Sequence, residues 1–333
     1  MERKHNLTID DIARDLGVSK TTISRAISGK GRISAATRER VQEYIQKMNY
    51  RPSAAAKGLA ESKTYNLALV LPKSLFKLDI PFVRKSMSAI CEEAFLQDYN
   101  ILLCLSTDDN PASLLRTLDN RKVDGVILSR TVENDTLVDM LSQRGIPFST
   151  MGSLPVQCQG LATVEADHDQ IGGCCAFTAA FLGNKCEQVA LFGKDMNYIV
   201  NQSRLKGFRQ GLQAIALPED LVTYRFGLES YSDCTEAVDE ALKCGIRRFL
   251  SMDEDLCMNI LTHIRSLGLQ IPQDVQVGSL YDSEQLAQHS PAISALNFDA
   301  AALGRAACRE LLRHLHNEEY DPHPTLGYRL LMR

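Results

Sequence analysis

The chain lacks any apolar run long enough to span a membrane, and its N-terminal segment MERKHNLTID lacks the apolar core of a signal peptide. The first absence argues against an integral membrane protein, and the second argues against secretion. We therefore expect a cytoplasmic protein that makes no contact with a membrane.

The sequence also lacks the residue spacings typical of metal, redox and common catalytic sites. Its ten cysteines include no CxxC pair, so we expect reduced thiols, no bound metal and no other cofactor. The motifs GxGxxG, GxxxxGK and GxSxG are absent. His168 stands between Asp167 and Asp169, which could indicate a metal site or a general base, but we expect it on a loop before a helix. We predict that the protein is not an enzyme.

Charge is distributed unevenly along the chain. Residues 1–63 carry 13 Lys and Arg against 7 Asp and Glu, whereas the rest carries 24 against 34. A chain of 333 residues is too long for one small core, so several domains are expected. A basic head on an acidic body indicates that the head meets a polyanion.

The head has the spacing of three short helices. Thr8, Ser19 and Ser34 can cap their N-termini, and Gly17 suits the left-handed residue that ends the first helix. Apolar residues then recur at helical spacing. The expected inner faces are Ile9, Ile12, Ala13 and Leu16; Ile23 and Ile27; and Val41, Tyr44, Ile45 and Met48.

The segment GVSKTTISRAISG, residues 17–29, is either a solvated Ser/Thr-rich stretch or the turn and second helix of a helix-turn-helix. In a helix-turn-helix, the N-terminal residues of the second helix enter the major groove. Arg25 could then bond guanine with two donors, and Lys20 could contact guanine or phosphate. The exposed set would be Ser19, Lys20, Thr21, Thr22, Ser24 and Arg25.

Residues 52–60 form a different kind of segment. Pro52 can start a helix, but the segment is only about two turns long. An isolated helix needs ~12–15 residues in water. Gly58 costs a further ~1 kcal/mol relative to Ala. We expect a hinge helix that forms only against a partner.

From Asn66 onward, strand-like and helix-like segments alternate, which predicts parallel sheets with helices on both faces. This length allows two lobes, with ligands at the carboxyl ends of the strands. The expected strands are Leu67–Leu71, Ile101–Leu105, Gly125–Leu128, Val189–Phe192, Arg248–Ser251 and Val275–Val277, with a last strand in LGYRLLMR. The expected helices include Phe82–Gln97, Gln170–Leu182, Arg204–Gln213 and Asp255–Leu267.

The head sequence LTIDDIARDLGVSKTTISRAISGKGRISAATRERVQEYIQKMNYRPSAAAKGLAESKT resembles that of lactose/galactose-repressor (LacI/GalR) family regulators. The likeness continues in VDGVILS, DHDQIGG, SRLKGF and IPQDV, so it covers essentially the whole chain. It implies an N-terminal all-α helix-turn-helix domain with a hinge helix, and a C-terminal α/β periplasmic-binding-protein-like body of two doubly wound parallel-sheet lobes. The implied domains are residues 1–50, 51–63 and 64–333.

The resemblance also implies DNA contacts. Lys20, Thr21 and Arg25 fall where the family reads bases, and Leu59 matches the leucine that wedges into the minor groove. The full expected set is Thr8, Ser19, Lys20, Thr21, Thr22, Ser24, Arg25, Ala56, Lys57 and Leu59.

The resemblance also implies an effector site, and three of its residues each have an alternative role. Arg204 matches the family's effector-binding arginine, although an arginine at a helix start is often only a surface charge. Asp167 matches an acidic residue at the mouth of the cleft in the second lobe, or it merely caps a helix. Phe82 either lines the cleft or belongs to the core.

Other positions depart from the family pattern. Glu254-Asp255 replaces the usual Asn-Asp pair, Tyr281 stands where an aspartate is usual and Asp282 follows it, and Phe298 replaces a polar residue. The expected effector set is Phe82, Asp167, Arg204, Glu254, Tyr281, Asp282 and Phe298. We expect a ligand with a stackable face and hydroxyls, most simply a sugar or sugar derivative.

The resemblance therefore predicts a ligand-responsive, DNA-binding transcriptional repressor of carbohydrate metabolism genes, located with the bacterial nucleoid. It would bind a near-palindromic operator as a homodimer, because one head makes few contacts. Effector binding between the lobes would change the order of the hinge helices. A sugar-binding module without DNA function and a sugar-modifying enzyme are the alternatives.

Overall fold

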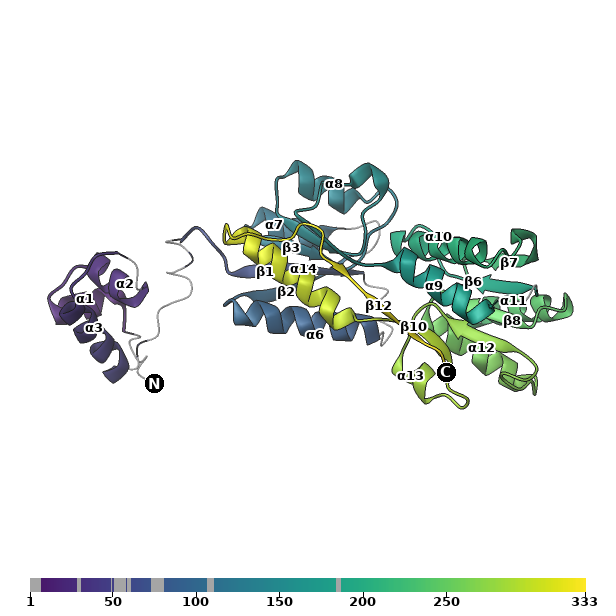
Figure 1. Ribbon diagram of the computed structural model, residues 1–333. Coiled ribbons are helices and arrows are strands. Elements are labelled where there is room, and N and C mark those ends of the chain that lie inside the picture. The colour runs from purple at the N-terminus through teal and green to yellow at the C-terminus, as the bar shows by residue number, and fades with distance from the viewer. Residues whose placement is uncertain are drawn as a thin grey trace. The chain divides into compact units, whose positions relative to one another are not determined.

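The computed structural model describes residues 7–28, 31–48, 50, 58, 61–72, 81–106, 111–183 and 187–333. The chain divides into two compact units, Met1–Thr64 and Tyr65–Arg333, whose elements Figure 1 labels. Within the described ranges, no helix has the length and apolarity that crossing a membrane requires.

The three helices predicted in the head are present among the described residues of the first unit: α1 (Ile9–Leu16), α2 (Lys20–Ser28) and α3 (Ala35–Lys47). Thr8 and Asp11 form a reciprocal capping box, in which each residue's backbone N–H donates to the other's side chain, at 3.0 and 3.3 Å. Gly17 ends α1 with φ +64°, the left-handed conformation that favours glycine. Ser34 caps α3 by accepting the Thr37 N–H at 3.1 Å.

The three helices bury one small core. Ile12, Ile23, Ala26 and Val41 are at most 1% exposed, so the predicted inner faces of the helices do meet. Met48 was predicted on this inner face, but that prediction is wrong because α3 ends at Lys47 and the Met48 side chain is 47% exposed.

The predicted hinge helix lies almost entirely outside the described residues, and so do Ala56, Lys57 and Leu59. Gly58 is described, and it is helical and buried. A Cβ atom at Gly58 would lie 2.5 Å from the carbonyl oxygen of Lys63. Gly58 therefore permits a close backbone approach, in addition to its cost in helix propensity.

In the second unit, one six-stranded parallel sheet forms the N-lobe. Leu67, Leu69 and Leu71 face one layer of helices and Ala68 and Val70 face the other, which explains the continuous apolar run. The strands, in spatial order, are β11 (Thr325–Leu326), β5 (Val164–His168), β4 (Phe148–Met151), β3 (Gly125–Leu128), β1 (Asn66–Pro72) and β2 (Asn100–Ser106). The helices are α6 (Pro81–Leu96) and α14 (Ala300–Leu315) on the first face, and α7 (Ala112–Asp119) and α8 (Thr136–Gln143) on the second.

A second six-stranded sheet forms the C-lobe. Its strands, in spatial order, are β12 (Tyr328–Leu331), β10 (Ser294–Phe298), β9 (Gln276–Ser279), β8 (Arg248–Ser251), β6 (Val189–Phe192) and β7 (Val222–Arg225). All neighbours are parallel except β12, which runs antiparallel to β10, so the predicted parallel sheet has one antiparallel edge.

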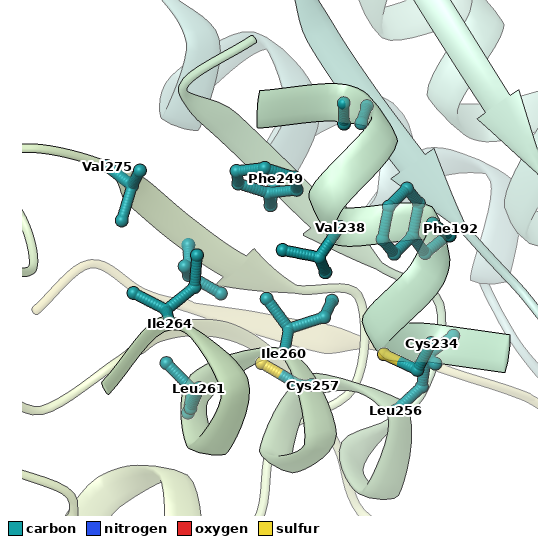
Figure 2. Close-up of a cluster of buried hydrophobic side chains, with 14 of the residues drawn as sticks. Phe192, Cys234, Val238, Phe249, Leu256, Cys257, Ile260, Leu261, Ile264 and Val275 are labelled. Carbon is teal, nitrogen blue, oxygen red and sulfur yellow. The ribbon is translucent and has the colours of Figure 1, made fainter. Parts of the chain in front are cut away.

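Helices cover both faces of the C-lobe sheet. On one face lie α9 (Gln170–Leu182) and α10 (Ile199–Ala214); on the other lie α11 (Tyr231–Lys243), α12 (Glu254–Ser266) and the short α13 (Glu284–Gln288). Figure 2 shows the core of the second face, where the rings of Phe192 and Phe249 meet edge to face at 5.8 Å. Val238 of α11 and Ile260 of α12 point into the same cluster.

The chain crosses between the lobes after β5, after β10 and between β11 and β12. Two of these crossings pack together, because the His168 ring lies 5.1 Å from the Phe298 ring. His168 Nε2 lies 3.2 Å from the Asp299 carbonyl oxygen, which can only accept, so Nε2 carries the proton. His168 was predicted on a loop, but it is the buried last residue of β5.

Candidate functional site

The α2 helix presents a polar face to solvent. Lys20, Thr21, Ser24 and Arg25 are exposed, Thr22 is half-buried, and Ile23 and Ala26 hold the opposite face in the core. Ser19 Oγ accepts the Thr22 N–H at 3.1 Å and so caps the helix, as predicted. This arrangement is that of a helix-turn-helix whose second helix is available at its N-terminal end.

Lys20 and Arg25, the two cations of this face, each contact another residue of the head. Lys20 Nζ forms an ion pair with Asp10 of α1. The Arg25 stem lies over Gly31, where an added Cβ would come 3.0 Å from Arg25 Cδ. Binding to DNA through either cation therefore competes with a contact inside the head.

The hydroxyl of Thr8 is also engaged. It donates to Asp11 Oδ2 at 2.6 Å and accepts the Asp11 N–H at 3.3 Å, within the capping box of α1. Its predicted DNA contact would therefore be made from a hydroxyl already fixed in orientation.

In the body, Arg204, Tyr281 and Phe82 meet where the lobes contact each other. The Arg204 guanidinium lies 5.5 Å from the centre of the Tyr281 ring, and the Phe82 ring of the N-lobe lies 6.1 Å from that ring. Arg204 is 8% exposed, donates to the Met252 carbonyl oxygen at 2.8 Å and keeps a buried Nε with no hydrogen-bond partner among the described residues. Arg204 was expected at a helix start, but it lies within α10, which begins at Ile199.

Charged residues of both lobes lie in the same region. Lys85 of α6 pairs with Glu284 of the C-lobe at 3.1 Å. Burial raises the pKa of Glu254, whereas the Ser283 hydroxyl and the positive charge of Lys85 lower it. Burial also raises the pKa of Tyr281. We call Phe82, Lys85, Arg204, Glu254, Tyr281 and Glu284 the interlobe cluster.

Two predicted effector residues are engaged by other side chains of the body. Asp282 forms an ion pair with Arg333 at 2.8 Å and accepts from Asn297 Nδ2 at 3.2 Å, so its carboxylate is bound within the C-lobe. Phe298 is buried against His168 at the crossing of the lobes. Of the two candidates Tyr281 and Asp282, the ring of Tyr281 is the one beside Arg204.

The prediction for Asp167 is wrong in two respects. It lies within β5 of the N-lobe sheet rather than in the second lobe, and the N-cap of α9 is Asp169, which accepts the Gly172 N–H at 2.8 Å. Asp167 instead accepts from the Ser153 hydroxyl and from the His168 N–H. Burial raises its pKa to about 6, against the opposing effect of these hydrogen bonds.

Sequence reasoning also missed charged residues on α6 and after the ends of β6 and β8. Lys85 is one, because its partner Glu284 is distant in the chain. Asp253 is another: it caps α12 by accepting the Leu256 N–H at 3.1 Å, and burial together with neighbouring Asp255 raises its pKa. Lys194, which follows β6, pairs with Asp253 and Asp255. The polar residues that follow β6 and β8 were the available signal.

Two surface pockets lie away from the interlobe cluster. One, of about 250 Å³, is lined by residues that include Arg265, Ile271 and His289. The other, of about 210 Å³, lies between α6 and α14 and includes Glu93 and Arg309. Neither contains a residue of the predicted effector set.

Comparisons with known proteins match both units. Residues 8–53 match the family "Bacterial regulatory proteins, lacI family", and residues 178–333 match the periplasmic binding protein-like domain. Catabolite control protein A of Streptococcus mutans is 27% identical over 327 residues, which cover 96% of this chain and 95% of that protein.

Solved structures agree with this result. The complex of the transcriptional regulator CelR with cellobiose matches with a TM-score of 0.72 and 25% identity, over 98% of this chain and 99% of that one. The Lac repressor dimer bound to operator and an anti-inducer matches with a TM-score of 0.79 over 98% of each chain, and at 19% identity this likeness concerns the fold. The chain therefore combines a helix-turn-helix domain that matches the lacI family of bacterial regulatory proteins with a two-lobed body that matches the periplasmic binding protein-like domain.

Proposed function

We propose that the protein is a cytoplasmic transcriptional repressor that binds a near-palindromic operator as a homodimer and responds to a sugar-type effector held between its lobes. In this proposal, residues 1–50 read DNA, residues 51–63 form the hinge and residues 64–333 bind effector and dimerise. The observation that carries it is the lacI-family head at residues 8–53, joined to a body similar to that of CelR with cellobiose.

In the DNA complex, Lys20, Thr21 and Arg25 contact bases from the exposed face of α2. Ser19, Thr22, Ser24 and Thr8 supply hydroxyls for phosphate oxygens. Ala56, Lys57 and Leu59 enter the minor groove on the hinge helix, with Leu59 as the wedge. The short exposed face of α2 supports a dimer, because two half-sites double the number of contacts.

The effector contacts centre on Arg204. Its buried Nε is a free donor among the described residues, and the Tyr281 and Phe82 rings beside it offer faces on which a pyranose ring can stack. Glu254 adds an acceptor for sugar hydroxyls. Asp167, Asp282 and Phe298 belong to a second rank of candidates, because each is packed against other side chains of the body.

The dimer face is proposed on the N-lobe. Phe95 and Leu96 at the end of α6 are 79% and 72% exposed, and Leu103 and Leu105 are exposed on β2, an edge strand of the sheet that packs against α6. Large apolar side chains gathered on one surface are typical of a protein interface. The similar Lac repressor structure is a dimer.

Operator selection followed by a ligand screen tests this function. The full-length protein would be incubated with random duplex DNA, and the bound fraction sequenced, with a palindromic consensus as the expected result. A thermal-shift screen of mono- and disaccharides, cellobiose included, would then identify sugars that raise the unfolding temperature. Sugar binding without any enriched DNA sequence would favour a sugar-binding module and overturn the proposal.

A further inference from the structure

An antiparallel β-bridge between Val132 and Tyr198 joins the two lobes. The Glu133 N–H donates to the Asn197 carbonyl oxygen at 2.8 Å, and the Ile199 N–H donates to the Thr131 carbonyl oxygen at 3.2 Å. Residues 130–133 lie between β3 and α8 of the N-lobe, whereas residues 197–202 lead into and begin α10 of the C-lobe. We call residues 130–133 together with residues 197–202 the interlobe clasp.

Side chains reinforce this backbone bridge. The Arg130 guanidinium lies 4.1 Å from the centre of the Tyr198 ring, within the range of a cation–π contact. Gln202 Nε2 donates to Glu133 Oε2 at 3.2 Å. Both contacts link the N-lobe to the first turn of the helix that carries Arg204.

Each half of the clasp is held rigidly by its own lobe. In the N-lobe, buried Asp135 accepts the N–H groups of Val132, Leu137 and Val138, and the Thr131 hydroxyl donates to the Ser153 carbonyl oxygen at 2.5 Å. In the C-lobe, Asn201 Nδ2 donates to the Asp195 carbonyl oxygen at 2.8 Å. Each half of the clasp is therefore preorganised by its own lobe.

The interlobe cluster connects the two lobes through elements other than those of the clasp. Phe82 contacts Tyr281 there, and Lys85 pairs with Glu284. Arg204 belongs to this cluster and contacts the ring of Tyr281 there. Arg204 is also connected to the clasp by the α10 helix. Its position therefore depends on how the lobes are arranged.

We propose that Arg130 and Tyr198 are positioning residues, which fix the start of α10 against the N-lobe and thereby hold Arg204 in the interlobe cluster. The inference rests on the proposed function, because it assigns these residues to the regulation of the same site. An effector that binds Arg204 favours the lobe arrangement in which the clasp is formed.

Hydrogen exchange of the full-length protein, followed by mass spectrometry, tests this proposal. In Arg130→Ala and Tyr198→Ala, amides of residues 131–133 and 197–199 should exchange between about 2-fold and 30-fold faster, the range set by the strength of a cation–π contact. Residues 281–284 should also exchange faster, although neither substitution touches them. Tyr198→Phe keeps the ring and should restore wild-type protection.

Arg209→Ala is the matched control, because Arg209 stacks on Tyr224 at 5.4 Å from the same helix but within the C-lobe. It should leave residues 281–284 protected. Unchanged exchange of residues 281–284 in Arg130→Ala would overturn the proposal, as would an equal increase in the control. Faster exchange throughout β6 and β8 would indicate general destabilisation and would count against it too.

The proposed function is judged separately on the same samples. Operator binding is measured separately on the wild-type protein in the absence of sugar. A wild-type protein that selects no DNA sequence would reject the proposed function, whereas the exchange result would still decide whether the clasp couples the lobes.

Discussion

Arg204 and Tyr281 hold each other at the contact between the lobes, with the guanidinium 5.5 Å from the ring centre. The Phe82 ring of the N-lobe lies 6.1 Å from the Tyr281 ring, and the Met252 carbonyl oxygen accepts a hydrogen bond from the arginine. Tyr281 of the C-lobe therefore contacts Arg204 of its own lobe and Phe82 of the N-lobe. A ligand that engages Arg204 must affect the contact between them.

Arg204→Ala should abolish the response to sugar and leave operator binding intact. The substitution removes a charged donor, whose hydrogen bonds are worth about 1.5–3 kcal/mol each. Fluorescence anisotropy of labelled operator DNA, titrated with a sugar that shifts the wild-type unfolding temperature, measures the response. Arg209→Ala, which alters a more exposed arginine of the same helix, is the control. A normal response in Arg204→Ala would remove this residue from the site.

Arg25→Ala should weaken binding to the selected operator by about 1–3 kcal/mol and relax the preference at one base pair in each half-site. The guanidinium is exposed on α2 and can leave its position over Gly31. Affinities for operators mutated at each position give the measurement. Arg14→Ala, on α1, controls for the loss of one positive charge. Wild-type affinity in Arg25→Ala would refute the assigned role.

Asp10→Asn should strengthen DNA binding. Asp10 pairs with Lys20 at the exposed face of the head, so its carboxylate both holds the lysine and repels phosphate. The slope of log K against log salt should steepen by about one unit, because one more cation is available for phosphates. Glu43→Gln removes the same charge from α3 and should change the slope less. Weaker binding, or an unchanged slope, would contradict this role of Asp10.

Leu59→Ala should reduce operator bending, because an apolar wedge is what keeps a base step unstacked. Fluorescence transfer between dyes at the two ends of the operator measures the bend. Leu59→Met, which retains an apolar side chain of similar volume, should bend DNA almost as the wild type does. A normal bend with alanine would sink the wedge hypothesis.

Asp167→Asn should make the body more stable than that of the wild type, and this difference in stability should grow as pH rises. Burial raises the pKa of Asp167 to about 6 in the folded protein, above the unfolded value of about 3.9. The folded state therefore binds the extra proton between these values, and wild-type stability falls as pH increases through this window.

Thermal unfolding of the two proteins at pH 4 and pH 7 measures the difference, and the advantage of the Asn variant should be greater at pH 7. Asp119→Asn changes an exposed carboxylate of the N-lobe and should show no such trend. A pH-independent difference between Asp167→Asn and the wild type would show that Asp167 is ionised equally in both states.

The strands that could be predicted are those with continuous apolar runs. β3, β6 and β8 have the expected bounds, because each is buried on both faces. β4 and β5 were missed because their sequences, FSTM and VEADH, contain polar residues; Ser149 and Thr150 are nonetheless fully buried. The first turn of α10 was missed because Tyr198 supplies no side-chain cap.

The site was predictable only as a set of residues, without their mutual contacts. Arg204, Tyr281 and Phe82 come from elements far apart in the chain, and nothing in their local sequence specifies that they meet. Arg333 forms an ion pair with the carboxylate of Asp282, and no motif indicated this pairing. Charge pairs across such distances depend on the tertiary fold, which periodicity does not encode.

The crossings between the lobes have a consequence for the order of folding. The N-lobe takes α14 and β11 from the last part of the chain, and Leu303, Ala307 and Leu311 of α14 fill its core against α6. During synthesis, the head can fold as soon as it emerges, whereas the N-lobe must wait for residues beyond 300. A ribosome-bound chain would therefore carry a folded DNA-reading head before its regulatory body is complete.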